Sequence, residues 1–337
     1  MLKSVLPRLL LALGTGIVIS AAPAPHYGVV RQISGPDGGW DYARVDPATG
    51  RLYVAHGDSV TEIDTANGDT VRSLGAIAHS HAVVPIPGGT LLLVTSGHDD
   101  SVRLLDTKDG SEVAKIAVGT DPDAAFYDPE SRQAVVMNAR AGTVSVIDVA
   151  ARSVVRTIML KPALEYGALG EGGTLFVNNE DANEVETADL ATGKVGPAIA
   201  MPGCEGPTGL AYDARTHRLI SACANGKAVV IDARARRVVA MLTIGKGPDA
   251  VILDAERRLA FIPCGRDGVL EVISLDGPGG ARIVDTVKTE TGARTGALDP
   301  KDGTLYLPTA RFAPPAKPGT RPSAVPGSFH VLVIARR

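Results

Sequence analysis

The sequence predicts an all-β fold, a seven-bladed β-propeller made of four-stranded antiparallel blades. A phrase of alternating apolar residues that ends in "VID" or a close variant returns at intervals of 41–43 residues. Each copy follows a second apolar run and a turn, so that one unit holds four short strands. Repeats of this length are typical of propeller blades, because one unit cannot bury both faces of its sheet until it stacks on its neighbours.

The repeat is clearest at the end of the third strand of each unit. This position holds Asp64, Asp106, Asp148, Asp189, Asp232 and Ser274. A seventh copy, "FHVLVIA", places Ala335 there after 61 residues. The longer interval contains a Pro-rich insertion, residues 312–328, whose prolines favour a stiff, extended segment. We expect the insertion at the far mouth of the central channel or at its rim, away from the starts of the innermost strands.

The other strands of each unit follow from a second marker. An Asp, followed by Pro at residues 46–47 and 299–300, begins the turn after the first strand. The second strand is a short apolar run such as "LYVAH" or "VVMNA", and a fourth strand follows the "VID" position. The last unit supplies three strands. We therefore expect residues 27–33, "YGVVRQI", to pair with "HVLVIA" and to close the ring.

The N-terminus predicts an export signal. Lys3 and Arg8 give a positive start, residues 9–19 are apolar, and "SAAPA" offers small residues for cleavage. A membrane anchor is the alternative, but the apolar run is shorter than the roughly 18 residues that cross a bilayer. We expect residues 1–24 to be a signal peptide and residues 25–337 to form one propeller. The mature protein is then a periplasmic or secreted monomer without a membrane span.

The composition limits the partners and the chemistry. The formal net charge is −3 and aromatic residues make up 4% of the chain. Proteins that bind nucleic acid normally carry a basic face, so we do not expect nucleic acid as a partner. The sequence contains no HExxH, GxSxG, phosphate-loop or CxxCH motif. Covalent haem and the common zinc-protease chemistry therefore have no support.

The second-strand phrases "YVAH", "VVMN" and "FVNN", each followed by a "VID"-like run, resemble the YVTN-repeat β-propeller family of exported bacterial proteins. The resemblance covers the mature chain, and residues 204–225 together with the closing "VPGSFHVLVIAR" look like one widespread branch. It implies the fold and export. It does not choose a function, because propellers of this kind serve as binding platforms, electron-transfer partners and enzymes.

The repeat also aligns the positions where each innermost strand begins, beside one mouth of the channel. Five residues before each Asp46-type marker stand Asp41, His81, Asp123, Glu165, Thr208, Asp249 and Arg294. The marker is not an Asp in the second and fourth units, so His81 and Glu165 depend on the alignment. Glu205, three residues before Thr208, adds a further carboxylate. We expect these ligand-binding candidates to share one channel mouth.

Carboxylates of one sign, gathered together, raise one another's pKa and are stabilised by a cation. A mixed Asp, Glu and His set suits a divalent metal ion, with His81, Asp123, Glu165 and Asp249 as the metal-ligand candidates. Arg294 would then hold an anionic group of a substrate. The alternative is a solvated rim without a function, since polar residues cost little in a water-filled channel. His56 and His98, near the ends of second strands, are expected as surface or turn residues.

The three cysteines lie in neighbouring units. The start of a first strand lies beside the end of the second strand, which brings Cys204 near Cys223 and predicts a disulfide between them. Cys264 is then a free, buried thiol. A bridge between Cys223 and Cys264 and a cysteine-containing metal site are the alternatives.

Three functions follow from these observations. The first is a binding propeller that takes a small molecule or a protein at its acidic channel mouth. The second is a lyase or hydrolase that uses a divalent metal as cofactor and acts there on a small anionic substrate. The third, implied by resemblance to amine-dehydrogenase-type propellers, is an electron-transfer partner.

Overall fold

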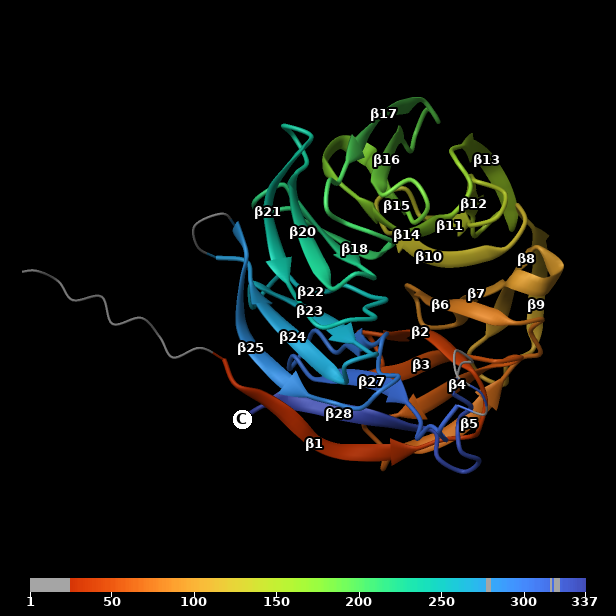
Figure 1. Ribbon diagram of the computed structural model, residues 1–337. Coiled ribbons are helices and arrows are strands. Elements are labelled where there is room, and N and C mark those ends of the chain that lie inside the picture. The colour runs from red at the N-terminus through yellow and green to blue at the C-terminus, as the bar shows by residue number, and fades with distance from the viewer. Residues whose placement is uncertain (1–24, 277–279, 316, 318–321) are drawn as a thin grey trace, which may run out of the picture.

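The computed structural model describes residues 25–276, 280–315, 317 and 322–337. The expected signal peptide, residues 1–24, lies outside the described residues. The described chain forms seven four-stranded antiparallel sheets, which surround a central axis like the blades of a propeller (Figure 1). The predicted fold class is therefore confirmed.

The strands of each blade run from the channel outwards. Blade 1 contains β2 (Trp40–Val45), β3 (Arg51–His56), β4 (Ser59–Asp64) and β5 (Thr70–Leu74). Blade 2 contains β6 (Ser80–Ile86), β7 (Leu91–Ser96), β8 (Ser101–Asp106) and β9 (Glu112–Ala117). Blade 3 contains β10 (Pro122–Asp128), β11 (Gln133–Asn138), β12 (Thr143–Asp148) and β13 (Ser153–Met159). Blade 4 contains β14 (Leu164–Leu169), β15 (Thr174–Asn179), β16 (Glu184–Asp189) and β17 (Val195–Ala200).

The remaining blades follow the same order. Blade 5 contains β18 (Pro207–Asp213), β19 (Arg218–Cys223), β20 (Lys227–Asp232) and β21 (Arg237–Thr243). Blade 6 contains β22 (Ile252–Asp254), β23 (Leu259–Cys264), β24 (Val269–Ser274) and β25 (Arg282–Lys288). Blade 7 contains β26 (Ala297–Leu298), β27 (Leu305–Thr309), β28 (His330–Arg336) and β1 (Tyr27–Ser34). Two short 3-10 turns are η1 (Gly97–Asp99) and η2 (Glu171–Gly173).

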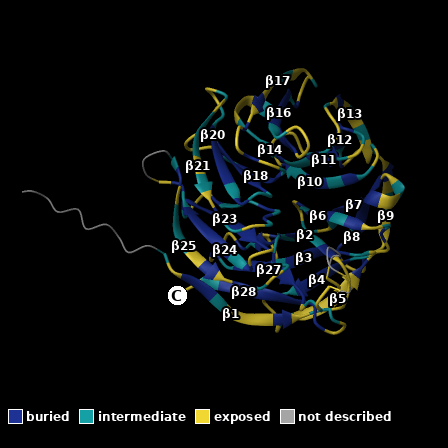
Figure 2. Cartoon of the chain, viewed as in Figure 1, coloured by how far each residue is buried: buried dark blue, intermediate teal, exposed yellow. Residues whose placement is uncertain are grey.

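The core lies between the blades, on the two middle strands of each sheet. These strands are buried on both faces, whereas the outermost strands carry exposed residues (Figure 2). Strands covered on both sides read as continuous apolar runs, which explains phrases such as "LYVA" in β3 and "LAFI" in β23. Tyr53 and Phe261 are the largest side chains in this layer that are almost fully buried.

The Asp that marks the first turn of most blades has a structural role. Asp46 accepts hydrogen bonds from the Ala48 amide at 3.0 Å and from the Thr49 hydroxyl at 2.7 Å. Asp213 does the same for Arg215 and Thr216. An Asp side chain that binds the backbone two residues later stabilises a tight turn. The role of this repeated Asp is therefore to shape the turn.

Blade 7 closes the ring with strands from both ends of the chain. Its order is β1-β28-β27-β26, and β1 pairs along its length with β28, from Tyr27 opposite Arg336 to Ser34 opposite His330. Figure 1 shows red β1 beside blue β28. The predicted closure by residues 27–33 is therefore confirmed.

The structure joins Cys204 to Cys223 in a disulfide, with their Cα atoms 5.5 Å apart. Pro207, which begins β18, pairs with Cys223 at the end of β19, so the two cysteines meet where the first and second strands of blade 5 lie side by side. Cys264 is free and buried. The predicted pairing is confirmed. It replaces the two alternatives, a bridge between Cys223 and Cys264 and a cysteine-containing metal site.

The Pro-rich insertion lies on the same side of the disc as the starts of the innermost strands. Its described part contacts Trp40, the first residue of β2, whose ring centroid lies 6.1 Å from Phe312 and 5.5 Å from Phe329. The Gly327 amide donates to Asp37 at 2.6 Å. The expectation of a far mouth or rim was wrong. In an antiparallel blade the second strand ends beside the start of the first, so the turn that follows it shares that face.

Candidate functional site

The strand register confirms that the predicted ring positions are equivalent. In the first five blades the first residue of the innermost strand pairs with the last residue of the second strand, and the ring residue follows directly. His81 follows Ser80, which pairs with Ser96, and Glu165 follows Leu164, which pairs with Asn179. The two alignments that lacked an Asp marker are therefore correct.

Two backbone features place the ring side chains at the mouth. The register shifts by one residue immediately after the first pair in each of these five blades. Such a β-bulge turns a side chain away from its normal face and is frequent beside binding sites. The residue two positions before the ring residue has positive φ in His79, Asp121, Ala163, Gly206, Gly247 and Gly292. Three of these are not glycine, and strain of this kind gathers at functional sites.

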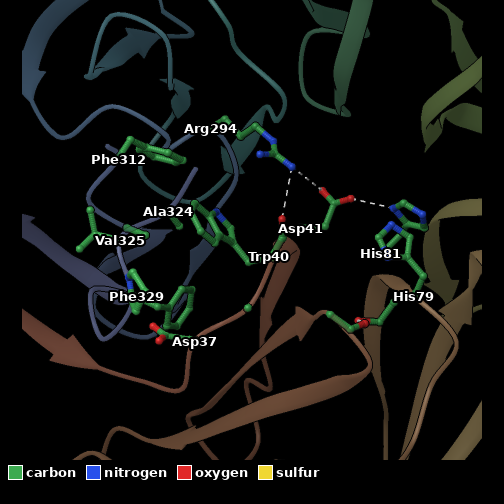
Figure 3. Close-up of a pocket in the computed structure, with 16 residues that line it drawn as sticks. Asp37, Trp40, Asp41, His79, His81, Arg294, Phe312, Ala324, Val325 and Phe329 are labelled. Atoms are coloured by element: carbon green, nitrogen blue, oxygen red, sulfur yellow. Dashed lines mark hydrogen bonds and ion pairs between the residues drawn. The ribbon is translucent and has the colours of Figure 1, made fainter. Parts of the chain in front are cut away.

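Five ring residues form one continuous line of charge across five blades. His81 Nδ1 lies 2.9 Å from Asp41 Oδ2 and 3.6 Å from Asp123 Oδ1. The next link joins Arg294 to Asp41 at 3.9 Å. Arg294 Nε donates to Asp249 at 2.8 Å, which ends the line. Figure 3 shows its centre, with Asp41 between Arg294 and His81. Segments far apart in the sequence thus build one site.

The carboxylates of this line are held in surroundings that oppose their charge. Burial and the nearby Asp41 raise the pKa of Asp123 to about 8. The same two causes raise the pKa of Asp249 to about 6, although Arg294 acts in the other direction. Burial, Asp123 and Asp249 raise the pKa of Glu165 well above its usual value. Burial and mutual repulsion thus favour the protonated forms of Asp123 and Glu165, and a bound cation would favour their charged forms.

The two cationic side chains of the line are engaged by its acids. Burial alone would lower the pKa of His81, but the hydrogen bond with Asp41 and the charge of Asp123 raise it. Arg294 binds Asp249 and also donates to the Trp40 carbonyl at 3.2 Å. Its charge is therefore offset within the protein. This weakens the expectation that Arg294 holds an anionic substrate group.

Thr208 and Glu205 are not part of this line. The Thr208 hydroxyl donates to the carbonyls of Ala222 and Pro248, so it joins blades 5 and 6 instead of facing a ligand. Glu205 is exposed on the loop beside the disulfide. Thr208 thus occupies its predicted position in the strand, and ligand binding by Thr208 or Glu205 stays a prediction. A Thr hydroxyl can donate to backbone carbonyls, which an ionised carboxylate cannot, and this explains why the side chain at this position in blade 5 turns inward.

The predicted metal ligands are brought together in part. The side chains whose ligand atoms lie within 4.8 Å of one another are Asp41, His81 and Asp123. Among the described residues, Glu165 and Asp249 do not join this group, because Asp249 pairs with Arg294. Asp41 takes their place. Of the four candidates, His81 and Asp123 lie in this group and Glu165 and Asp249 do not, and metal binding by any of them stays a prediction.

A floor of aromatic side chains lies below the ring. The rings of Tyr42 and Tyr166 lie 5.2 Å apart, and the Arg44 guanidinium lies 5.6 Å from the Tyr166 centroid. The cavity beside them measures about 20 Å³, room for about one water molecule. Burial and the carboxylates of Asp249 and Asp123 raise the pKa of Tyr42 well above its usual value, so its hydroxyl stays protonated.

A cavity with a volume of about 600 Å³ opens above the ring. Asp41, His81 and Arg294 line one part of it. The insertion and its neighbours line the other part with Phe312, Ala324, Val325, Pro326 and Phe329. Figure 3 shows Trp40 on the side of the insertion and His79 and His81 opposite. The cavity thus joins an apolar wall to a charged floor, the usual composition of a small-ligand site.

Sequence reasoning missed several residues of this site. Trp40 stands one residue before the aligned ring position and Phe329 begins the seventh copy of the repeat, but the alignment singled out neither of them. His56 is buried against Phe329 instead of exposed. His98 stacks on His79 with centroids 4.4 Å apart. Glu180 contributes to the raised pKa of Glu165. The position after each second strand is otherwise Gly or Ala, as in Gly57, Gly97, Ala139, Ala224, Gly265 and Ala310. Aligning it would have singled out Glu180.

The fold is a seven-bladed β-propeller, and a cavity with charged and apolar side chains opens at one channel mouth. No family model and no curated protein match the sequence. The solved structure titled Kuenenia stuttgartiensis Hydrazine Synthase contains a similar chain, with 18% identity, a TM-score of 0.70, and coverage of 88% of this chain and 95% of that chain. A chain in the crystal structure of the Mitotic Checkpoint Complex has 15% identity, a TM-score of 0.73, and coverage of 90% and 95%.

These likenesses show the fold alone, since sequence identity is low and propellers support unrelated functions. Among the described residues, no helix has the length and apolarity to cross a membrane. The function must therefore be argued from the channel mouth.

Proposed function

We propose that this protein is an exported binding propeller whose channel mouth takes a small, positively charged ligand. One observation carries the proposal. Carboxylates from separate blades gather at the channel mouth, where Asp41 lines a cavity of about 600 Å³, and burial together with mutual repulsion raises the pKa of Asp123 and of Glu165. A cation bound there would favour the charged forms of these carboxylates and relieve their repulsion.

The apolar wall selects the rest of the ligand. Trp40, Phe312 and Phe329 form one cluster, with centroid distances of 6.1 and 5.5 Å from the indole. Aromatic faces attract cations and bury apolar groups. A ligand with a charged end and an apolar body therefore fits the cavity in one orientation. Export rests on the N-terminal signal pattern and the disulfide, which persists in oxidising compartments.

Ligand binding at the channel mouth can be measured by fluorescence. Trp40 is the single tryptophan and lies on the cavity wall, so its fluorescence reports on this site alone. The probes are 2-phenylethylamine and 3-phenylpropanoate, which share a ring and a chain and carry opposite charges. In protein freed of metal, we expect a saturable change with the amine and none with the carboxylate. Asp41→Asn should weaken amine binding at least about tenfold, since it removes one half of a partly buried charge pair.

The control is Asp302→Asn, which removes an acid from the turn between β26 and β27, on the opposite face. It should bind the amine as the unmodified protein does. Equal responses to both probes, or amine binding that ignores Asp41→Asn, would count against the proposal. A metal-dependent lyase or hydrolase is the second candidate function, favoured by the convergence of Asp41, His81 and Asp123.

A further inference from the structure

The ligand atoms of Asp41, His81 and Asp123 have the spacing of a metal site. His81 Nδ1 lies 2.9 Å from one carboxylate oxygen and 3.6 Å from the other, and all three ligand atoms lie within 4.8 Å of one another. Zinc bonds to nitrogen and oxygen are about 2.0–2.1 Å long, which places tetrahedral ligands about 3.3 Å apart. A small shift of side chains would therefore admit the ion.

The backbone under these three residues is held by buried threonines. The Asp41 carbonyl accepts from Thr295 at 2.7 Å, and the Asp123 carbonyl accepts from Thr95 at 2.9 Å. The Thr95 hydroxyl also accepts from the amide of Ala82, beside His81, at 2.8 Å. One threonine thus ties together the segments that carry His81 and Asp123. Binding needs pre-positioned ligands, and this network supplies them.

An independent observation points to a ligand in the same cavity. Trp40 is 8% exposed, and its Nε1 has no hydrogen-bond partner among the described residues. A buried indole N–H normally donates to an acceptor. The indole lines the cavity with Asp41 and His81, and no carboxylate of the ring pairs with it. An oxygen atom of a bound ligand would satisfy it.

We propose that Asp41, His81 and Asp123 bind a divalent transition-metal ion, with Zn²⁺ the best fit, and that its open position takes an oxygen ligand beside Trp40. The inference rests on the proposed function, because it places a cation among the same side chains of the channel mouth. Three protein ligands with one open position are typical of reactive zinc sites, whereas structural sites use four. Calcium and magnesium prefer more oxygen atoms and no imidazole.

The metal would also decide the ligand class. Zinc balances the charges of Asp41 and Asp123, while Arg294 already balances Asp249. The loaded cavity then accepts an anionic oxygen group at the metal, with an apolar body against Phe312 and Phe329. The chemical class is an aromatic or aliphatic carboxylate. The metal-free cavity, in contrast, favours a cation.

The experiment uses tag-free protein freed of metal with a chelator and titrated with ZnCl₂ by calorimetry. We expect one ion per chain, with affinity reduced at least about 100-fold by Asp123→Asn and by His81→Gln, beyond the loss that a supporting residue causes. Two matched controls are Asp302→Asn, an acid in the turn between β26 and β27, and His217→Gln, an imidazole in the turn between β18 and β19, both on the opposite face. Both should bind zinc within about twofold of the unmodified protein.

Co²⁺ provides a second readout that does not depend on the variants. As a paramagnetic, visibly absorbing substitute for zinc, it should quench Trp40 fluorescence at one equivalent, whereas Zn²⁺ should not. In zinc-loaded protein, 3-phenylpropanoate should now change the Trp40 signal. Its binding should depend on the metal.

Three results would overturn the inference. If the protein binds no zinc at concentrations up to about 1 mM, the proposed metal site does not exist. If the same sample still binds the amine, the proposed function stands. Zinc binding that survives Asp123→Asn but is lost in His98→Gln would assign the ion to the imidazoles of His79 and His98. If zinc binds but does not change the binding of 3-phenylpropanoate, the proposed anionic ligand at the metal is refuted.

Discussion

Glu165 shows how single residues at the mouth act against the stability of the fold. It is half-buried at the start of β14, and burial together with Asp123 and Asp249 raises its pKa well above the usual value. Holding such a group in place costs stability whenever it is charged. Sites that bind ligands often carry strain of this kind, which the ligand relieves. The sequence predicted this residue from its alignment, but burial could be judged only in three dimensions.

We predict that Glu165→Gln raises the melting temperature at neutral and alkaline pH. The folded pKa lies above the unfolded one, so the protein loses stability as the pH rises through the folded pKa. Gln does not titrate, and the two proteins should melt alike below about pH 4, where an ordinary Glu is protonated. Melting curves of metal-free protein across pH measure this. Glu130→Gln, on an exposed turn, should show no such pH-dependent gain; an equal gain there would refute the argument.

At the scale of elements, the bulged start of each innermost strand is the unit that builds the site. Its freed carbonyls accept hydrogen bonds from the preceding blade. Asn178 on β15 donates to the Thr208 and Gly209 carbonyls of β18, at 2.8 and 3.1 Å. Periodicity predicted the strands and the ring positions because both repeat in the sequence. It could not predict the pairing of Arg294 with Asp249, which depends on side-chain reach between blades.

Gly209 tests how closely these bulges pack. A Cβ atom there would lie 2.4 Å from the Ala250 carbonyl carbon and 2.5 Å from the Val251 nitrogen, both backbone atoms of the next blade. We predict that Gly209→Ala lowers the free energy of unfolding by about 1–3 kcal/mol, since backbone cannot move aside as a side chain can. Gly39→Ala, with open space around its Cβ, is the control and should lose much less. Urea denaturation measures both, and equal losses would show that the blades do not meet as described.

At the scale of the molecule, ring closure makes the separate blades one site. The line from Asp123 to Asp249 crosses blades 3, 2, 1, 7 and 6, so it passes the seam where β1 meets β28. The sequence predicted this seam because its last unit lacked one strand. It did not predict the position of the insertion, because the turn after the second strand was expected on the face opposite the starts of the innermost strands. The insertion supplies the apolar wall, so this error hid half of the cavity.

Removal of β1 should therefore open the closure of blade 7 and leave β28 as an unpaired edge strand that can bind other chains. β28 would present unpaired backbone groups along "HVLVIAR", a strand whose residues Val331 to Ile334 are now buried. Exposed apolar edges recruit other strands. We predict that a chain beginning at Gly35 self-associates and melts at a lower temperature than a chain of residues 25–337, which should be a monomer by light scattering.

A peptide of residues 27–34 supplies the control, because an added strand can complete a sheet edge in trans. With it, the chain that begins at Gly35 should return to a monomer and regain most of its melting temperature. A peptide with the same composition in scrambled order should not, since the register from Tyr27 to Ser34 places Tyr27 and Ile33 in the core. If the shortened chain stays monomeric and equally stable without peptide, β28 does not depend on β1, and the closed ring is not what holds the mouth together.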